Sequence, residues 1–198
     1  MTRMNRESEL DLVARLRAGD PGAFDAIHGH FNARLFNFLA RLSRRRDVAE
    51  DLVEETWLRV VDRAPRLRPD TSLGPWLFTV ARNLYVSYCR SRLIEDSHAP
   101  TLVGLWPSGT PAPSPFDRTL ARETGHRLDR AIATLPAVYR EAVLLVAVEG
   151  LRPAEAAEIC GVAPEAMRQR LSRARAMIAR TLDEESQPNL ATLKEVTT

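Results

Sequence analysis

Residues 135–182 read LPAVYREAVLLVAVEGLRPAEAAEICGVAPEAMRQRLSRARAMIARTL, and the order of proline, apolar and glycine positions in this stretch decides the fold. Pro136 suits the N-terminus of a helix, the apolar run 139–148 has the length of a helix, and Gly150 ends it. We therefore expect one helix over this run, followed by a turn.

Two further helices are predicted next, separated by a tight turn. Pro153 starts a short helix over 154–160, and Gly161 can adopt the left-handed conformation that ends it. Pro164 then opens a third helix, which runs to about Leu182. Two helices joined by a glycine-containing turn predict a helix-turn-helix unit.

The third helix has two faces of opposite character. Its apolar positions follow 4-3-4 spacing and share one face: Met167, Leu171, Ala174 and Ile178. The rest of its surface carries polar groups that can bind base edges and phosphates. These are Glu165, Arg168, Gln169, Arg170, Ser172, Arg173 and Arg175. A solvated, arginine-rich surface helix is the alternative, but the glycine turn and the preceding short helix favour DNA binding.

An acidic helix is predicted in the first half of the chain. Asp47 can cap a helix over 48–61, one face of which is apolar. Its other face is acidic and consists of Glu50, Asp51, Glu54 and Glu55. An acidic face on a DNA-binding protein can dock a basic protein surface. Charge alone, however, favours a solubilising face placed near a helix N-terminus.

A second long helix follows the turn-rich stretch 70–75 and is predicted from Trp76 to about Arg92. Along it runs a polar strip: Thr79, Asn83, Ser87 and Arg90, with Arg82 beside them. A polar strip next to a loop can read the edges of an unstacked base while arginine holds the nucleic-acid backbone. The competing interpretation is that Trp76 and the other aromatic residues of this helix are ordinary core.

Between the two helical halves lies a proline-rich stretch. Residues 95–116 contain five prolines, a density that excludes a helix and favours an extended tether. Strand signals are weak throughout. The predicted fold is therefore all-α, with two small helical domains over 10–94 and 122–183, a linker over 95–121 and a polar tail over 184–198.

Composition excludes several classes of protein. The chain has 28 Lys+Arg against 26 Asp+Glu, and Lys194 is the only lysine. Cys89 and Cys160 cannot form a disulfide framework, so a cytoplasmic location and core packing of both thiols are expected. No run is apolar enough for a membrane span, and the N-terminus is too polar for a signal peptide. The four histidines are scattered, so neither a metal, a cofactor nor a catalytic residue is expected.

The motifs, taken in order, resemble one family, the extracytoplasmic-function (ECF) sigma factors of the sigma-70 family. The motifs are AEDLVEETWL at 49–58, WL at 76–77, ARN at 81–83, LP at 135–136, EGL at 149–151, GV at 161–162 and RQRLSRAR at 168–175. The proline-rich tether lies where that family has the linker between its regions 2 and 4.

The resemblance implies a role for each surface. The acidic helix would dock on the β′ clamp helices of core RNA polymerase through Glu50, Asp51, Glu54, Glu55 and Leu58. Residues that would bind the melted −10 promoter element are Ser72, Trp76, Arg82, Asn83 and Arg90. The seven polar residues of the third helix would read the −35 element in the major groove, and apolar surfaces of the same domain would bind the β flap. The resemblance also implies an anti-sigma factor as partner, and no enzymatic activity.

The chain departs from the family pattern at three places. Glu54 stands where many members have glutamine, Arg152-Pro153 replaces a usual Ser-Tyr cap, and Leu73-Gly74-Pro75 makes the specificity loop stiffer. Two other classes of function compete with the resemblance. One is a polymerase-independent helix-turn-helix repressor or activator that dimerises through its N-terminal helices. The other, a nucleic-acid enzyme or structural adaptor, is disfavoured because no residues are arranged for chemistry.

Overall fold

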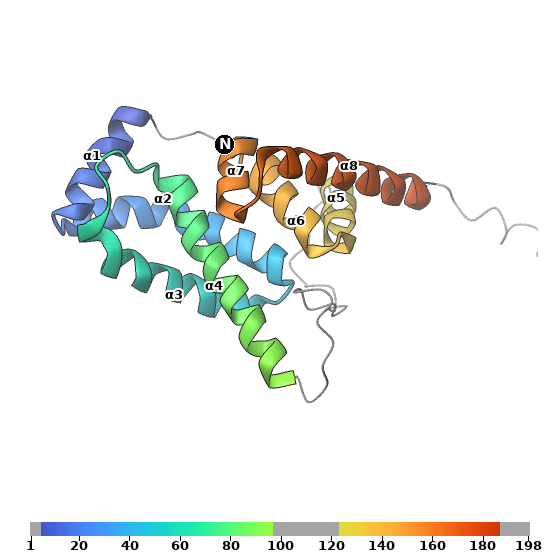
Figure 1. The fold of residues 1–198 in the computed structure, drawn as a ribbon, viewed down its shortest axis with the longest axis horizontal. Coiled ribbons are helices and arrows are strands. Elements are labelled where there is room, and N and C mark those ends of the chain that lie inside the picture. Colours follow the sequence, from blue (N-terminus) through green and yellow to red (C-terminus); the bar gives the residue numbers. More distant parts are fainter. Residues whose placement is uncertain (1–4, 97–122, 187–198) are drawn as a thin grey trace, which may run out of the picture.

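The computed structural model describes residues 5–96 and 123–186, and within these ranges the chain is helical with no strand. The predicted all-α class is confirmed. The helices form two groups that lie against each other (Figure 1). Most of the proposed linker and the end of the tail lie outside the described residues.

The N-terminal half is built around α2, which packs against α3 and α4. The elements are α1 (Arg6–Arg17), α2 (Pro21–Ser43), α3 (Arg46–Arg63), the 3-10 turn η1 (Ala64–Arg66) and α4 (Leu73–Asp96). Asp20 caps α2, because its carboxylate accepts a hydrogen bond from the Gly22 N–H at 2.8 Å. In the core, the rings of Phe38 and Phe78 meet edge to face with centroids 5.3 Å apart.

Two predicted helix starts in this half were wrong. Helix α3 begins at Arg46 with Arg45 as its N-cap, and Asp47 lies within the first turn, where it forms an ion pair with Arg45. Helix α4 begins at Leu73 rather than at Trp76. The Leu73 side chain is fully buried, and its N–H donates to Glu9 Oε1 at 2.7 Å. The helix therefore gains a buried apolar anchor and an acceptor for an otherwise unpaired N–H.

The C-terminal half contains the predicted helix-turn-helix. Its elements are α5 (Glu123–Thr134), α6 (Ala137–Val143), the π-helical turn η3 (Leu144–Val148), α7 (Pro153–Cys160) and α8 (Pro164–Ser186). The run expected as one helix is thus split into α6 and η3, and α8 extends beyond Leu182. The predicted apolar face of α8 is confirmed, since Met167, Leu171 and Ala174 are buried and Ile178 is half-buried against the core.

The start of α7 shows how the chain compensates for its unusual cap. Arg152 is the N-cap residue, and its backbone N–H donates to Glu155 Oε2 at 2.7 Å, while its guanidinium pairs with Glu155 Oε1 at 2.8 Å. Glu155 therefore accepts from the N-cap N–H as the glutamate of a capping box does, although no serine hydroxyl is present to accept from the helix in return. At the other end, Gly161 has φ of +64°, which confirms the predicted left-handed stop.

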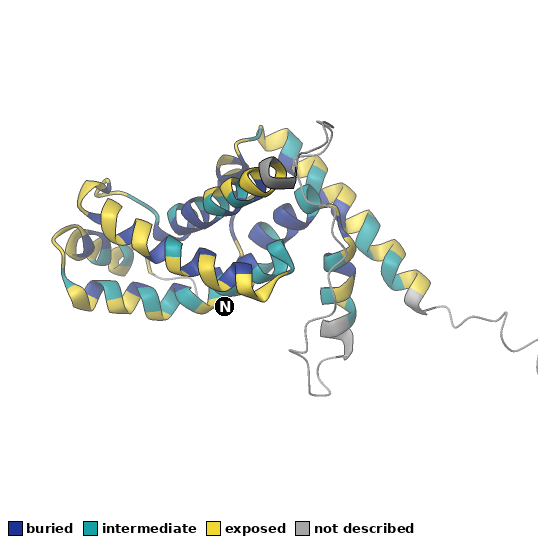
Figure 2. Ribbon diagram, turned by 90° about the horizontal axis from the view of Figure 1, so that it is seen from below, coloured by how far each residue is buried: buried dark blue, intermediate teal, exposed yellow. Residues whose placement is uncertain are grey.

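The two halves contact each other directly. Helix α4 packs against α7, and α2 packs against α6 and η3. Coloured by burial, the ribbons have their buried residues on the surfaces that face neighbouring helices, with exposed residues on the outside (Figure 2). The surfaces assigned from the sequence to two separate domains therefore sit within one compact arrangement.

The turn at Gly161 gives a direct test of the helix-turn-helix geometry. Gly161→Ala is expected to lower the free energy of unfolding by about 1 kcal/mol, because an L side chain is disfavoured in the left-handed region. A Cβ atom at this position would meet no other atom, so the cost comes from the backbone alone. Gly29→Ala, in the interior of α2, is the matched control and should be neutral or stabilising. Urea denaturation measures the free energy of unfolding of both variants. Equal losses in the two variants would contradict the left-handed conformation assigned to Gly161.

Candidate nucleic-acid and protein-docking interfaces

The outward surface of α3 combines acidic and apolar side chains. Glu50, Asp51 and Glu54 are exposed and Glu55 is half-exposed, as the sequence pattern predicts. Leu58 is 66% exposed and Val61 58% exposed, although both are large apolar residues. An exposed apolar patch beside acidic residues can contact a protein partner. We call the surface formed by these six residues the docking face.

The sequence analysis named Leu58 beside the acidic residues and did not name Val61, which is also exposed. The two residues are one turn apart on α3 and lie off its buried side. Arg46 and Arg59 flank the acidic residues and pair with Glu50 and Glu55, both at 2.8 Å. These exposed i, i+4 pairs contribute little stability, so the carboxylates remain able to exchange them for the cations of a partner.

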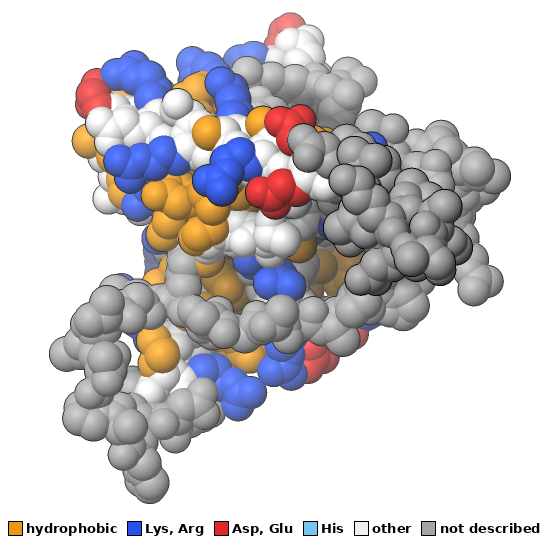
Figure 3. All heavy atoms as spheres, turned by 90° about the vertical axis from the view of Figure 1, so that its right-hand side faces the viewer, with side chains coloured by type: hydrophobic (Ala, Val, Ile, Leu, Met, Phe, Trp, Pro, Cys, Tyr) orange, Lys and Arg blue, Asp and Glu red, His pale blue; other side chains and the backbone are white. Residues whose placement is uncertain are grey.

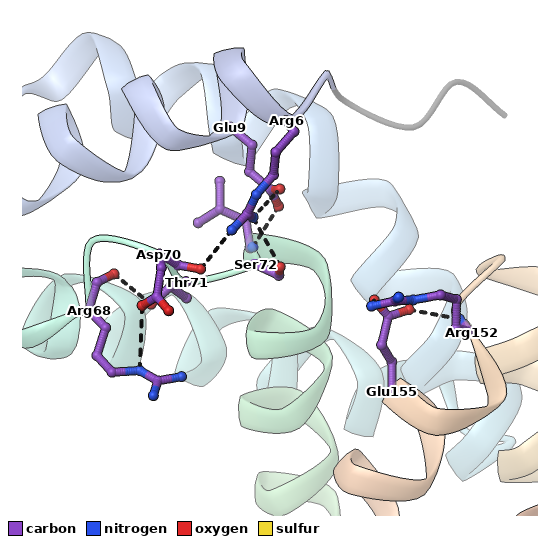
Figure 4. A network of polar contacts seen from close by, with 9 residues as sticks. Arg6, Glu9, Arg68, Asp70, Thr71, Ser72, Arg152 and Glu155 are labelled. Atoms are coloured by element: carbon purple, nitrogen blue, oxygen red, sulfur yellow. Dashed lines mark hydrogen bonds and ion pairs between the residues drawn. The ribbon is translucent and has the colours of Figure 1, made fainter.

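The loop before α4 is held in place by α1, which the sequence analysis did not anticipate. Arg6 donates to the Asp70 carbonyl oxygen at 2.9 Å and to Ser72 Oγ at 3.1 Å, while Glu9 accepts from the Leu73 N–H (Figure 4). Thr71 Oγ1 adds a bond to the Arg68 carbonyl at 2.7 Å. These contacts fix the loop conformation ahead of any ligand.

A groove of about 480 Å³ separates this loop from α7. Ser72, Trp76 and Thr79 line one side, and Arg152 and Ile159 line the other. In Figure 4, Arg152 and Glu155 lie across from the loop. Trp76 is half-buried and packs against the core, so one part of its ring is structural and another part faces the groove. Both interpretations of Trp76 thus have support.

The polar strip on α4 is divided between two environments. Asn83, Ser87 and Arg90 are exposed along one side of the helix, at 4 and 3 residue spacing. Arg82 is different, because its side chain is only 19% exposed and its Nε lies 2.9 Å from Glu141 Oε1 on α6. The structure therefore brings Asn83, Ser87 and Arg90 together at the surface and turns Arg82 toward the C-terminal half. Thr79 is half-buried, and its hydroxyl donates to the Pro75 carbonyl at 2.7 Å.

The predicted DNA-reading face of α8 is exposed at six of its seven residues: Glu165, Arg168, Gln169, Ser172, Arg173 and Arg175. Arg168 pairs with Glu165 within the helix. Arg170 is the exception, with its side chain 24% exposed and its Nη1 4.0 Å from Glu141 Oε2. Seen from the end of the molecule toward which α8 runs, arginine side chains gather over the upper part of the surface (Figure 3). This face is basic and accessible.

Charged side chains are buried between the two halves, and the sequence analysis found none of them. The Glu149 side chain is 3% exposed and lies 3.0 Å from Arg34 Nε on α2. Burial raises the pKa of Glu149, and Arg34 opposes that rise. The Glu141 side chain is 1% exposed, and its Oε2 accepts no hydrogen bond from the described residues. Each carboxylate comes from the C-terminal half and meets an arginine of the N-terminal half.

Arg140 is the third buried charge at this boundary. Its guanidinium donates to the Leu42 carbonyl at 3.0 Å, to the Leu135 carbonyl at 2.8 Å and to the Ala133 carbonyl at 3.1 Å. Burial lowers its pKa to about 10. Arg140 thus joins the C-terminal end of α2 to the end of α5, which is a structural role.

The described residues contain no group of three His, Cys, Asp or Glu side chains that could hold a metal ion. Cys89 and Cys160 are buried, and burial raises the pKa of both thiols. A thiol in this state is a poor nucleophile, which agrees with the predicted core role. Among the helices of the described ranges, none has the length and hydropathy needed to cross a membrane.

Comparison with known proteins agrees with this geometry. Residues 28–93 match the family Sigma-70 region 2, and residues 125–178 match Sigma-70, region 4. RNA polymerase sigma factor CarQ of Myxococcus xanthus is 35% identical over 81% of this chain and 90% of its own length. ECF RNA polymerase sigma factor SigM of Mycobacterium tuberculosis is 31% identical over 90% of this chain and 86% of its own length.

A solved structure shares the fold over most of the chain. The sigma factor RpoE in complex with the anti-sigma factor NepR from Bartonella quintana superposes with a TM-score of 0.64, at 29% identity, covering 81% of this chain and 96% of that one. The chain therefore belongs to the extracytoplasmic-function group of the sigma-70 family, and it is a sigma factor that binds core RNA polymerase and promoter DNA to direct transcription initiation.

Proposed function

We propose that the sigma function is divided among three surfaces, with the docking face of α3 binding the polymerase core. Exposed carboxylates beside exposed Leu58 and Val61 suit a basic protein surface that also has an apolar component. Negative charge also keeps this face away from DNA, so that it does not compete with the other two surfaces. By resemblance to the family, the partner surface is the β′ clamp helices.

The −10 element is assigned to the strip Asn83, Ser87 and Arg90, together with Ser72 and Trp76 beside the groove. Exposed amide and hydroxyl groups can read the edges of a base that has left the stack, and an arginine can hold the adjacent phosphate. The loop held by Arg6 and Glu9 supports this assignment, because a loop fixed in advance loses less entropy when it captures the base. Arg82 is assigned to the same element, on the family motif that contains it, although here its guanidinium pairs with Glu141.

The −35 element is assigned to the exposed polar face of α8. The observation that carries this proposal is that the arginine-rich face is exposed on the helix that directly follows the Gly161 turn. Arginine binds guanine edges with two hydrogen bonds and binds phosphates as a cation. The corresponding functional boundaries are 10–94 for region 2, 95–121 for the linker, 122–183 for region 4 and 184–198 for the tail. Apolar surface of region 4 would bind the β flap.

Regulation and location follow from the relatives. An anti-sigma factor is proposed as a partner because the Bartonella quintana relative was solved in complex with one. This chain would act in the cytoplasm, where the polymerase works. A role in the response to stress or to another environmental signal fits this group of sigma factors.

Run-off transcription tests the function itself. Purified core polymerase is incubated with a library of promoter fragments from the source genome, with and without this chain. Transcripts with discrete starts that require the chain are the expected result, and their shared upstream sequences give the −10 and −35 elements. If core polymerase neither binds this chain nor starts transcripts with it, a stand-alone helix-turn-helix regulator would explain the DNA-binding surface better.

Charge reversal tests the docking face. The double variant Asp51→Lys with Glu54→Lys is expected to bind core at least about tenfold more weakly, because two attractive contacts become repulsive. Glu7→Lys with Asp11→Lys, on exposed positions of α1, makes the same change in net charge and should leave binding unchanged. Fluorescence titration against core polymerase measures both. Equal loss in the two variants would mean that net charge, not this face, governs binding.

Single arginine variants test the face of α8. Arg168→Ala is expected to weaken holoenzyme binding to a mapped promoter by about 1–3 kcal/mol if the side chain reads a base, with loss of preference at one −35 position. If Arg168 binds a phosphate instead, the loss is uniform across sequences and the salt slope falls by about 1. Arg180→Ala, exposed farther along the same helix, is the control and should change neither quantity.

A further inference from the structure

Two of the three hydroxyl groups that line the groove beside α4 have already given their protons to the backbone. Thr71 Oγ1 donates to the Arg68 carbonyl at 2.7 Å. Thr79 Oγ1 donates to the Pro75 carbonyl at 2.7 Å. A hydroxyl group has one proton and two lone pairs, so both threonines can offer only lone pairs to a ligand in the groove.

Ser72, the third hydroxyl of the groove, is held in the opposite way. Its Oγ accepts from Arg6 Nη1 at 3.1 Å (Figure 4), and a guanidinium can only donate. Within residues 5–96 and 123–186, no hydrogen bond takes up the Ser72 proton. That proton is therefore available to a ligand, and the bond from the cationic Arg6 polarises the hydroxyl into a stronger donor.

The first turn of α4 does not need the Ser72 hydroxyl as a cap. Ser72 stands at the N-cap, because Leu73 is the first helical residue and the Ser72 carbonyl accepts from the Trp76 N–H at 3.1 Å. An N-cap serine usually accepts from the N–H of the second or third helical residue. The third residue here is Pro75, which has no N–H. The Leu73 N–H donates to Glu9 Oε1 instead, so α1 supplies the cap and the hydroxyl is left for the groove.

Arg6 holds Ser72 through a set of contacts that requires a guanidinium. Its Nη1 contacts Ser72 Oγ and also Glu9 Oε2 at 2.9 Å. Its Nη2 donates to the Asp70 carbonyl at 2.9 Å. A planar guanidinium makes such contacts at fixed angles, whereas the ammonium of lysine is a point charge on a flexible stem. The direction of the Ser72 hydrogen bond is therefore set by α1.

We propose that Arg6 and Glu9 are positioning residues for the −10 element, which fix Ser72 as a hydrogen-bond donor, so that the captured base is read through an acceptor atom and not through an N–H donor. The acceptor is a ring nitrogen or a carbonyl oxygen of the base. The inference rests on the proposed assignment of Ser72 and the groove to the −10 element. It gives part of the base preference to α1, a helix outside the surfaces assigned to DNA.

Binding of single-stranded −10 oligonucleotides to the holoenzyme measures this preference by fluorescence anisotropy. An abasic scan of the mapped promoter first locates the captured base. Analogues at that position then lack one acceptor atom, as in deazapurines or pyrimidines without one carbonyl oxygen, or lack one N–H donor. Loss of one particular acceptor should weaken binding by about three- to tenfold. Ser72→Ala should weaken binding of the natural oligonucleotide by a similar factor and should abolish the effect of that acceptor loss.

Variants of α1 then test whether Arg6 sets this effect. Arg6→Ala should reduce the effect of the acceptor loss to less than about twofold, because the Ser72 hydroxyl is then free to accept as well as to donate. Arg6→Lys keeps the charge and should not restore the effect. The matched control is Arg15→Ala, which should keep the full effect. Arg15 is likewise a half-exposed arginine of α1, but its ion pairs are with Asp11 and Asp20.

Glu9→Gln is a second test that does not depend on the folding of Arg6→Ala. The amide keeps an acceptor for the Leu73 N–H but removes the negative charge that pairs with Arg6 at 2.9 Å. It should reduce the effect of the acceptor loss in the same direction and by a smaller factor. Thermal unfolding of each variant checks that the fold is retained.

The outcomes separate this inference from the function on which it rests. A holoenzyme that binds none of the −10 oligonucleotides would overturn the assignment of the −10 surface itself. Binding that depends on Ser72 through an N–H donor of the base, or that does not depend on Ser72, would overturn only the inference. The inference is also wrong if the effect of the acceptor loss persists in Arg6→Ala or is fully restored in Arg6→Lys.

Discussion

The Glu141 carboxylate is the constraint on which the arrangement of this molecule depends. It is buried at the boundary between the two halves, where it meets Arg82 of one half and lies near Arg170 of the same half as itself. A carboxylate in such a place is stable only when cations are brought to it. Its pair with Arg82 joins α6 to α4, and α4 also packs against α7, which belongs to the same half as α6.

Local patterns were enough to predict which face of α8 is buried and which is exposed. The apolar spacing of α8 identified its buried side, and therefore its exposed basic face, because a helix repeats every 3.6 residues. Gly161 was predictable as a stop, since few other residues adopt a positive φ. The start of α7 at Pro153 was predicted, but the acceptor that Glu155 supplies to the Arg152 N–H was not, although Glu155 stands at the spacing of a capping box.

Contacts between distant segments could not be predicted in this way. Leu73 starts α4 because Glu9, 64 positions earlier, accepts its N–H. Arg34 meets Glu149 across 115 positions, and Arg82 meets Glu141 across 59. In a single sequence these arginines look like any other surface cation, and the short motif around Glu141 resembles an ordinary amphipathic helix. Only the packing of the halves makes them partners.

The surfaces proposed for binding differ in how accessible they are in this arrangement. The docking face of α3 is accessible, because its acidic and apolar residues are exposed. Arg82, which the sequence analysis assigned to the −10 element, instead pairs with the buried carboxylate of Glu141.

Site-specific photocrosslinking within the promoter complex tests this account most directly. A benzophenone amino acid replaces Ser87 on α4 in one chain and Ser172 on α8 in another, and each is assembled with core on a mapped promoter. The account predicts crosslinks to the −10 element from the first chain and to the −35 element from the second, about 25 base pairs apart. Crosslinks from both positions within a single helical turn of DNA would contradict it.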